Sequence, residues 1–348
     1  MKGKRYLIVL GLVILFCGVY FLNLSRAGEN EKGCFSNSLH YTTEGMRYWY
    51  EEQGGFKNIT QIPYSKLACK NCHANSCEKC HLEKKEGACS YTVAQARKMD
   101  TCLACHARAK LTFKFGKENG SLDIHVKNGM VCADCHKAED IHGDGKFYHS
   151  MRQPGAVKAS CNSCHEPDKS HRAHTIHKGK LDCTACHVSN TLSCMNCHFE
   201  QFLKTKEKKG NFFPVQSWTL LINYNGKVTT GNVQTLVYKQ KKFITYTPYF
   251  THAIQPKGRA CAECHANEAM ELIKDHRSIP MLQFVNNEIV PWKGVAPVVP
   301  EKLEWVFLDK KEDRWIPLRN REAPMVQFSG YGEPLTNEQI ERLLKSQK

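Results

Sequence analysis

The sequence predicts a chain of short α-helices and loops packed around something other than protein, and three features of its composition lead to this prediction. Only 41% of the 348 residues are hydrophobic, which is little for an aliphatic core of this size. The chain also has 19 cysteines and 17 histidines, too many for a reduced cytosolic enzyme without a metal or cofactor role. Lys and Arg outnumber Asp and Glu by 49 to 34. An ordinary Rossmann, barrel or coiled-coil protein is therefore excluded.

Sixteen of the cysteines form eight Cys-x-x-Cys pairs, and a histidine follows every pair. The paired cysteines are Cys69, Cys72, Cys77, Cys80, Cys102, Cys105, Cys132, Cys135, Cys161, Cys164, Cys183, Cys186, Cys194, Cys197, Cys261 and Cys264. The histidines that follow them are His73, His81, His106, His136, His165, His187, His198 and His265. Cys-x-x-Cys-His is the attachment signature of c-type haem. Its thiols bond to the haem vinyl groups, and its imidazole is the proximal ligand of the iron.

Zinc sites and redox dithiols also use Cys-x-x-Cys pairs, but neither needs a histidine at the next position. We therefore expect eight covalently bound haem c groups. The predicted fold class is a multihaem cytochrome c, mainly loops and short α-helices around stacked haems. A small β-rich insert and a haem-free C-terminal tail complete this prediction. With roughly 40 residues per haem, long regular helices and sheets are not expected.

The net charge of +15 would by itself suggest an acidic partner or nucleic acid. Each ferric haem with two histidine ligands and two propionates contributes about −1, however, so eight haems leave about +7 in the oxidised protein. The basic residues then mostly balance the propionates. We therefore expect no nucleic-acid partner.

Residues 1–27 have the pattern of an export leader. Lys2, Lys4 and Arg5 precede an uncharged, mainly apolar run over residues 6–24. This run would be ~28 Å long as a helix, close to the thickness of a bilayer core. The positive flank places the N-terminus in the cytoplasm and the haem domain outside. We favour a retained inner-membrane anchor with the haem domain in the periplasm. Cleavage after the sequence Ser25-Arg26-Ala27, which would release a soluble periplasmic or extracellular protein, is the alternative.

The positions of the motifs and the sequence patterns between them divide the rest of the chain into five segments. They are a haem-free lead (28–68), a seven-haem core (69–198), a β-rich insert (199–250), an eighth-haem segment (251–277) and a haem-free C-terminal region (278–348). Within the core, His73 and Cys77 can lie at most ~14 Å apart, so the first two haems must nearly touch. Such close spacing favours fast electron hopping.

Outside the motifs, several segments carry local signals of secondary structure. Residues 218–224 and 227–230 flank Asn225-Gly226, a hairpin signal, and residues 243–247 resemble a further strand. Residues 305–308 and 314–317 resemble a second hairpin. Residues 267–277 are expected to be helical, and Thr336 with Gln339 forms a capping box for a helix through Leu344.

Nine histidines lie outside the motifs, close to the eight that eight low-spin haems would need as distal ligands. Local context favours His125, His142, His177 and His252, and the other candidates are His40, His149, His171, His174 and His276. A surface or propionate-binding histidine is the alternative for each. The sequence does not pair a histidine with its haem.

Of the remaining cysteines, Cys34 and Cys89 either form a disulfide that ties the lead to the core or remain two buried thiols. Cys17 lies within the apolar run and is expected to be an ordinary membrane residue.

The motif-rich block resembles the multihaem cytochromes that carry respiratory electrons in anaerobic bacteria. Segments 129–136 and 194–200 carry this resemblance. Eight motifs also resemble, more distantly, the octahaem tetrathionate reductase and hydroxylamine oxidoreductase types and the pentahaem nitrite reductases. In nitrite reductase a lysine typically replaces the motif histidine of the catalytic haem, whereas all eight motifs here end in histidine. A distant lysine as sixth ligand, as in the tetrathionate reductase type, stays open.

Two functional hypotheses follow. The first is an electron carrier with no catalytic residues, which passes electrons from a quinol-linked or periplasmic donor to a downstream periplasmic or outer-membrane acceptor. The second is an octahaem reductase of a nitrogen or sulfur oxyanion such as tetrathionate, nitrite or hydroxylamine. The second would need an iron with an open position beside a basic pocket.

Overall fold

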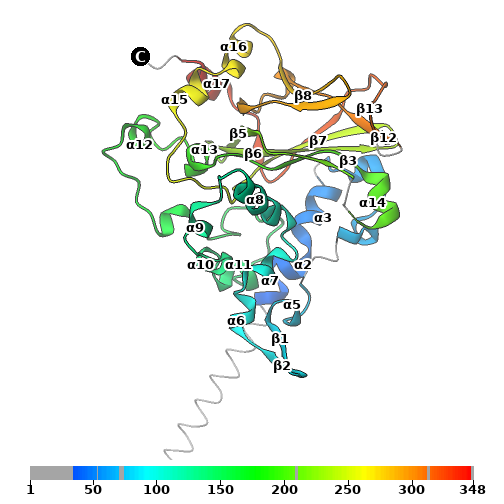
Figure 1. Cartoon of the computed structure of the whole chain (residues 1–348), viewed down its shortest axis with the longest axis vertical. Helices are drawn as coiled ribbons and strands as arrows, with labels where there is room; N and C mark the ends of the chain where they lie inside the picture. The colour runs from blue at the N-terminus through cyan, green and yellow to red at the C-terminus, as the bar shows by residue number, and fades with distance from the viewer. Residues whose placement is uncertain (1–33, 53, 70–73, 208–210, 312–313, 346–348) are drawn as a thin grey trace, which may run out of the picture.

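The computed structural model describes residues 34–52, 54–69, 74–207, 211–311 and 314–345, and Figure 1 shows their arrangement. The helical part that carries most of the motifs lies below a part rich in strands. The helical part also holds the small hairpin of β1 (Leu82–Lys85) and β2 (Ala88–Tyr91). Its helices are α2 (Leu39–Thr42), α3 (Glu44–Glu51), α4 (Lys57–Thr60), η1 (Tyr64–Lys66), α5 (Glu78–His81), α6 (Val93–Ala96), α7 (Met99–Leu103), α8 (Ala107–Glu118), α9 (Ile124–Lys127), α10 (Cys132–Cys135), α11 (Ala138–His142), η3 (Cys161–Ser163), α12 (Arg172–Ile176) and α13 (Cys183–His187).

Most of these helices are a single turn, as expected from the sequence. Thr92, Asp123, Ser160 and Asp182 each accept a backbone N–H with the side chain at the start of a helix, which satisfies groups that a short helix leaves unpaired. Only α8 in this part reaches 12 residues. These short helices therefore mainly position the Cys-x-x-Cys-His motifs and do not pack into a helical core of their own.

The strands, by contrast, form an eight-stranded sheet in the order β10-β5-β6-β3-β4, with β7 beside β6, β14 beside β7 and β15 beside β5. Its members are β3 (Ser193–His198), β4 (Phe213–Val215), β5 (Trp218–Tyr224), β6 (Lys227–Tyr238), β7 (Lys241–Pro248), β10 (Gly294–Pro297), β14 (Met325–Phe328) and β15 (Gly332–Glu333). The expectation of only a small β-rich insert without regular sheets was therefore wrong.

The larger sheet forms because this part of the chain has an ordinary apolar core. The low hydrophobic fraction, an average over the whole chain, did not reveal it. The largest fully buried side chains include Trp218, Leu220, Ile222, Ile244 and Met281, all on strands. These residues concentrate in residues 192–308, so this part of the chain buries enough apolar surface without a prosthetic group.

The hairpin predicted at Asn225-Gly226 is confirmed. β5 and β6 pair antiparallel with Tyr224 opposite Lys227, and both turn residues have positive φ angles of 51° and 74°. That geometry is the two-residue turn that Asn-Gly favours. The strand expected over residues 243–247 is also confirmed, as part of β7.

Helices are confirmed within residues 267–277 and after Thr336, whereas the first strand of the second hairpin lies at residues 308–311 rather than 305–308. The remaining elements do not form a separate tail. They are α14 (Phe199–Thr205), α15 (Cys261–His265), α16 (Glu268–Lys274), β8 (Ile279–Val285), β9 (Glu288–Pro291), η4 (Pro300–Lys302), β11 (Leu303–Trp305), β12 (Leu308–Lys311), β13 (Arg314–Pro317) and α17 (Asn337–Leu344). The second hairpin is β12–β13, and Thr336 caps α17. Strands β10, β14 and β15 join the large sheet, so residues from both sides of the eighth motif share one core.

The predicted leader, residues 1–27, lies outside the described residues. Among the residues that the structure does describe, no helix is both long and apolar enough to cross a bilayer.

The possible disulfide between Cys34 and Cys89 is not present, because both are free thiols. Cys89 is exposed on the β1–β2 hairpin, opposite Lys84. Cys34 packs instead beside the turn at Gly143 and Gly145, where a Cβ built on Gly145 would lie 3.6 Å from the Cys34 sulfur. The alternative of two buried thiols is also wrong for Cys89, which is exposed.

Candidate haem sites

Six of the motifs share one local conformation, a single helical turn. In four of them the histidine N–H donates to the carbonyl of the first cysteine, from His81 to Cys77, His106 to Cys102, His136 to Cys132 and His165 to Cys161, at 2.9–3.0 Å. The motifs at Cys183 and Cys261 lie within α13 and α15. A helical turn places residues three and four apart on one side. Both thiols and the imidazole of each motif can therefore reach the same flat ligand.

Each histidine of these six motifs faces a second histidine from another part of the chain. The distances between ring centroids are 6.0 Å for His81–His142, 6.1 Å for His106–His40, 6.4 Å for His136–His252, 5.9 Å for His165–His125, 6.2 Å for His187–His174 and 6.2 Å for His265–His177. Two metal–nitrogen bonds of about 2 Å, plus half a ring on each side, require ~6 Å. The residues therefore fit an iron bound by two axial imidazoles.

Hydrogen bonds that Nδ1–H donates orient seven of these histidine rings. The Nδ1–H groups of His81, His187 and His265 point at the carbonyls of Thr92, Gln255 and Leu343, at 3.2, 3.1 and 2.9 Å. His174 and His177 contact the carbonyls of Asp168 and Ala173 in the same way, and His125 and His136 contact the carboxylates of Asp123 and Asp140. Because these oxygens only accept, Nδ1 carries the proton and Nε2 is left for a metal.

Burial also favours the neutral imidazole that a metal needs. Burial lowers the pKa of His106, and the neighbouring His136 lowers it further. The pKa of His252 is lowered in the same way, first by burial and then by His136. Neutral rings at these positions fit axial ligands.

Thiols of neighbouring motifs also approach each other. The side chain of Cys102 hydrogen-bonds to Cys132, and that of Cys161 to Cys183. Haems bound at these motifs would therefore lie next to one another.

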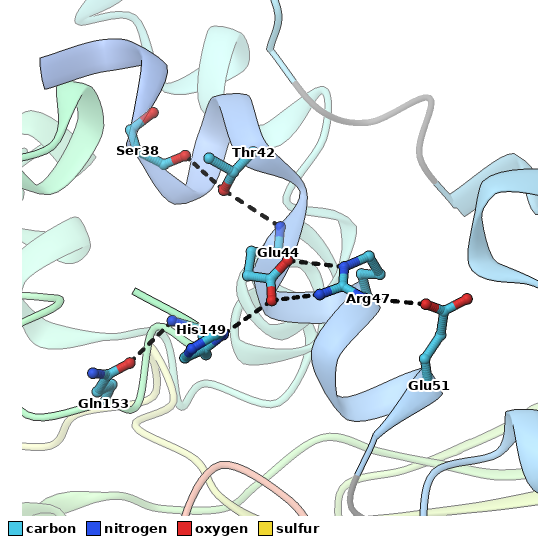
Figure 2. A network of polar contacts seen from close by, with 7 residues as sticks. All are labelled: Ser38, Thr42, Glu44, Arg47, Glu51, His149 and Gln153. Carbon is cyan, nitrogen blue, oxygen red and sulfur yellow. Dashed lines mark hydrogen bonds and ion pairs between the residues drawn. The ribbon is translucent and has the colours of Figure 1, made fainter. Parts of the chain in front are cut away.

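Three of the nine predicted distal histidines face no motif histidine among the described residues. His171 packs instead against His174, with centroids 5.3 Å apart. His276 lies exposed just beyond α16 with a φ of 55°. His149 holds the carboxylate of Glu44 at 3.0 Å from its Nδ1, within a polar network that Figure 2 shows.

In that network, Arg47 donates to both oxygens of Glu44, at 2.7 and 2.9 Å, and also to Glu51. Burial alone would raise the pKa of Glu44, but the hydrogen bonds from Arg47 and His149 hold it below its ordinary value. His149 therefore joins the segment before Ser150 to helix α3 by a charged contact.

The first and seventh motifs differ from the other six. Residues 70–73 of the first lie outside the described residues, so His73 has no described position. The seventh motif lies in strand β3, and Nε2 of His198 is 2.8 Å from the carboxylate of Asp309. This motif does not fit the pattern of the others.

The carbonyl and carboxylate oxygens that orient the histidine rings were not predicted from the sequence. Asp140 follows His136 by four residues and Asp123 precedes His125 by two, a local signal that could have identified them. The backbone carbonyls left no such signal. Within the described ranges, no group of three or more His, Cys, Asp or Glu side chains forms a metal cage. A haem iron does not need such a cage, because the porphyrin itself supplies four of its ligands and the protein only two.

Sequence comparisons show similarity between parts of this chain and known proteins. No family model and no solved structure matches the chain. The dissimilatory sulfite reductase MccA of Wolinella succinogenes is 23% identical over 187 residues, which cover 44% of this chain and 26% of that protein. The cytochrome c-type protein NrfB of Haemophilus influenzae is 26% identical over 145 residues, 37% of this chain and 54% of that protein. Cytochrome c-552 of the same species is 40% identical over 52 residues, 14% of this chain and 10% of that protein.

The chain is related to multihaem c-type cytochromes. It spans about half or less of the length of the curated relatives it matches. The prosthetic group of such cytochromes is covalently attached haem c, in agreement with the motifs.

Proposed function

We propose that this chain is an electron-transfer protein of anaerobic respiration that binds haem c through its Cys-x-x-Cys-His motifs. The single observation that carries the proposal is the set of six facing histidine pairs, with ring centroids 5.9–6.4 Å apart. Haem supplies an iron that alternates between two oxidation states. At six motifs the two facing histidines would both hold that iron, which would leave no position for a substrate there.

The arrangement of the motifs supports conduction between haems. The contacts of Cys102 with Cys132 and of Cys161 with Cys183 bring motifs together that lie about 20 to 30 residues apart in sequence. The hydrogen bonds of the histidine rings would keep the ligand geometry of each haem unchanged when its iron gains or loses an electron. The chain then supplies the spacing and the surroundings, which tune the potentials.

The proposed location follows from the chemistry and from the leader. Haem is attached to these motifs on the exported side in bacteria, and the first 27 residues have the pattern of an anchor or signal peptide. We therefore propose an exported protein with redox-protein partners: a quinol-linked or periplasmic donor and a periplasmic or outer-membrane acceptor.

The similarity to a protein described as a dissimilatory sulfite reductase favours a second candidate, a reductase of a sulfur or nitrogen oxyanion. Such a reductase needs one iron with an open position. The six motifs with facing histidines do not provide it.

Protein-film voltammetry of the purified, oxidised holoprotein separates the two candidates. A carrier gives a reversible multi-electron signal that does not change when sulfite, nitrite, tetrathionate or hydroxylamine is added. A catalytic reduction current with any of these substrates would replace the carrier proposal by the reductase.

A further inference from the structure

We propose that the seventh motif, Cys194–His198, binds no haem and instead serves as an interior strand of the large sheet, with neither cysteine bonded to a porphyrin. The inference rests on the proposed function, because it assumes that other motifs of the chain do bind haem. It reduces the predicted number of haems from eight to at most seven.

This motif lies in strand β3, which pairs with β4 as far as Met195 and with β6 at Cys194, Cys197 and His198, with a register shift between the two cysteines. In β3, Cys194 lies opposite Pro214 of β4 and opposite Gln234 of β6, and Cys197 lies opposite Leu236 of β6. The six motifs with facing histidines form a helical turn instead. In a strand, the hydrogen bonds that hold the segment go to neighbouring strands, and a haem-binding turn would have to break them.

The residue between the cysteines is fixed in the interior. Asn196 has no exposed surface and a positive φ of 51°. Its backbone N–H donates to the hydroxyl of Thr235 at 2.7 Å, and its side-chain oxygen accepts the N–H of Leu308 at 3.1 Å. Turning the motif toward a ligand would leave these buried groups unpaired, which is energetically unfavourable.

The second thiol has little room for a macrocycle. Cys197 is 8% exposed and is the only buried cysteine among the motif cysteines that the structure describes. It belongs to a cluster with Phe56, Phe199, Phe202 and Phe243. A porphyrin bonded to this sulfur would have to displace aromatic rings from a packed core.

The histidine of the motif holds a carboxylate with the nitrogen that an iron would need. Nε2 of His198 lies 2.8 Å from Asp309 Oδ1, whereas the oriented rings of the six pairs use Nδ1. The other oxygen of Asp309 accepts a hydrogen bond from Gln240 at 2.8 Å. His198 is only 14% exposed as a side chain, and no second histidine faces it in the described ranges. The contact ties hairpin β12–β13 to the sheet.

The sequence offers a test with an internal control, because one tryptic peptide carries both the sixth and the seventh motif. Trypsin cleaves after Lys180 and Lys204, and no lysine or arginine lies between them. The holoprotein is denatured, reduced, alkylated with iodoacetamide and digested, and the peptide 181–204 is analysed by tandem mass spectrometry.

We expect this peptide to carry one haem, at Cys183 and Cys186, and two alkyl groups, at Cys194 and Cys197. A haem at Cys194 and Cys197 would overturn the inference but not the proposed function. No haem on the peptide, with all four cysteines alkylated, together with haem-free peptides for the other motifs, would overturn the proposed function itself.

A pair of matched variants gives a second measurement that does not depend on the peptide. The double substitution C194A/C197A should leave the haem content per chain unchanged in the pyridine haemochrome assay, whereas C183A/C186A should lower it by one. A loss of one haem in both variants would contradict the inference.

Discussion

At the scale of single residues, a histidine can bind iron through Nε2 only if its Nδ1 carries the proton. Nδ1 of His177 points at the carbonyl of Ala173, and its ring lies almost parallel to that of His265, at 16°. The proposed proximal ligands can be identified in the sequence because each follows its cysteine pair directly. Distal partners could not be paired from sequence, since His252 faces His136 across more than a hundred residues.

Removing one distal ring should change the spin state of one iron. In H177A the haem attached through Cys261 and Cys264 would lose one histidine ligand of its iron, so one high-spin haem should appear while the haem content stays the same. The measurement is the electron paramagnetic resonance spectrum of the oxidised protein. H276A is the matched control, because His276 is exposed and faces no motif histidine among the described residues. An unchanged spectrum for H177A would refute this pairing.

At the scale of elements, local signals predicted individual strands and helices, whereas long-range pairing escaped them. The hairpin β5–β6 follows from Asn225-Gly226, and helix α17 follows from the capping box at Thr336. The parallel pairing of β10 with β5 joins Gly294 to Trp218 and has no local signature in the sequence. The size of the sheet was underestimated for this reason.

The turn between β5 and β6 should be sensitive to the side chain at Gly226. Its φ of 74° is in the left-handed region, which costs a residue with a side chain about 1–2 kcal/mol. G226V should therefore lower the free energy of unfolding by about that amount, as measured by chemical denaturation followed by circular dichroism. K227V places the same side chain one residue later, at an exposed position within β6, and should be nearly neutral. Equal losses in both variants would contradict the turn geometry.

The contact between helix α3 and His149 should make stability depend on pH. The pKa of Glu44 is below its ordinary value of 4.5 in the folded protein, through its bonds to Arg47 and His149, although burial opposes this. A carboxyl with a lowered folded pKa stabilises the fold above its unfolded pKa, and this stabilisation is lost as pH falls through the folded pKa. E44Q should therefore be less stable than the natural protein at pH 7, by roughly 1–3 kcal/mol.

The difference between E44Q and the natural protein should shrink when denaturation is repeated at pH values below 4.5. The control is E338Q, which removes an exposed carboxylate that pairs with Arg342 and Lys180. Water and salt screen exposed ion pairs, so E338Q should have little effect at any pH. A difference for E44Q that is constant over the whole pH range would contradict the role of its charge.

At the scale of the whole molecule, two kinds of interior explain the composition. The helical part holds the facing histidines and short helices, and the strand-rich part has its own apolar core around Trp218 and Met281. The low hydrophobic fraction predicted the first kind of interior, packed around haem, and concealed the second, apolar one. The basic excess of +15 fits a chain that must balance the propionates of several haems.

The main proposal is that six irons held by this chain would have two histidine ligands each and that the chain passes electrons without reducing a substrate. The most direct test is the electron paramagnetic resonance spectrum of the oxidised holoprotein, combined with the haem content from pyridine haemochrome. We expect at most seven haems per chain, at least six of them low-spin, with no change in the spectrum when nitrite or sulfite is added. A high-spin signal of about one haem that responds to either anion would contradict the proposal.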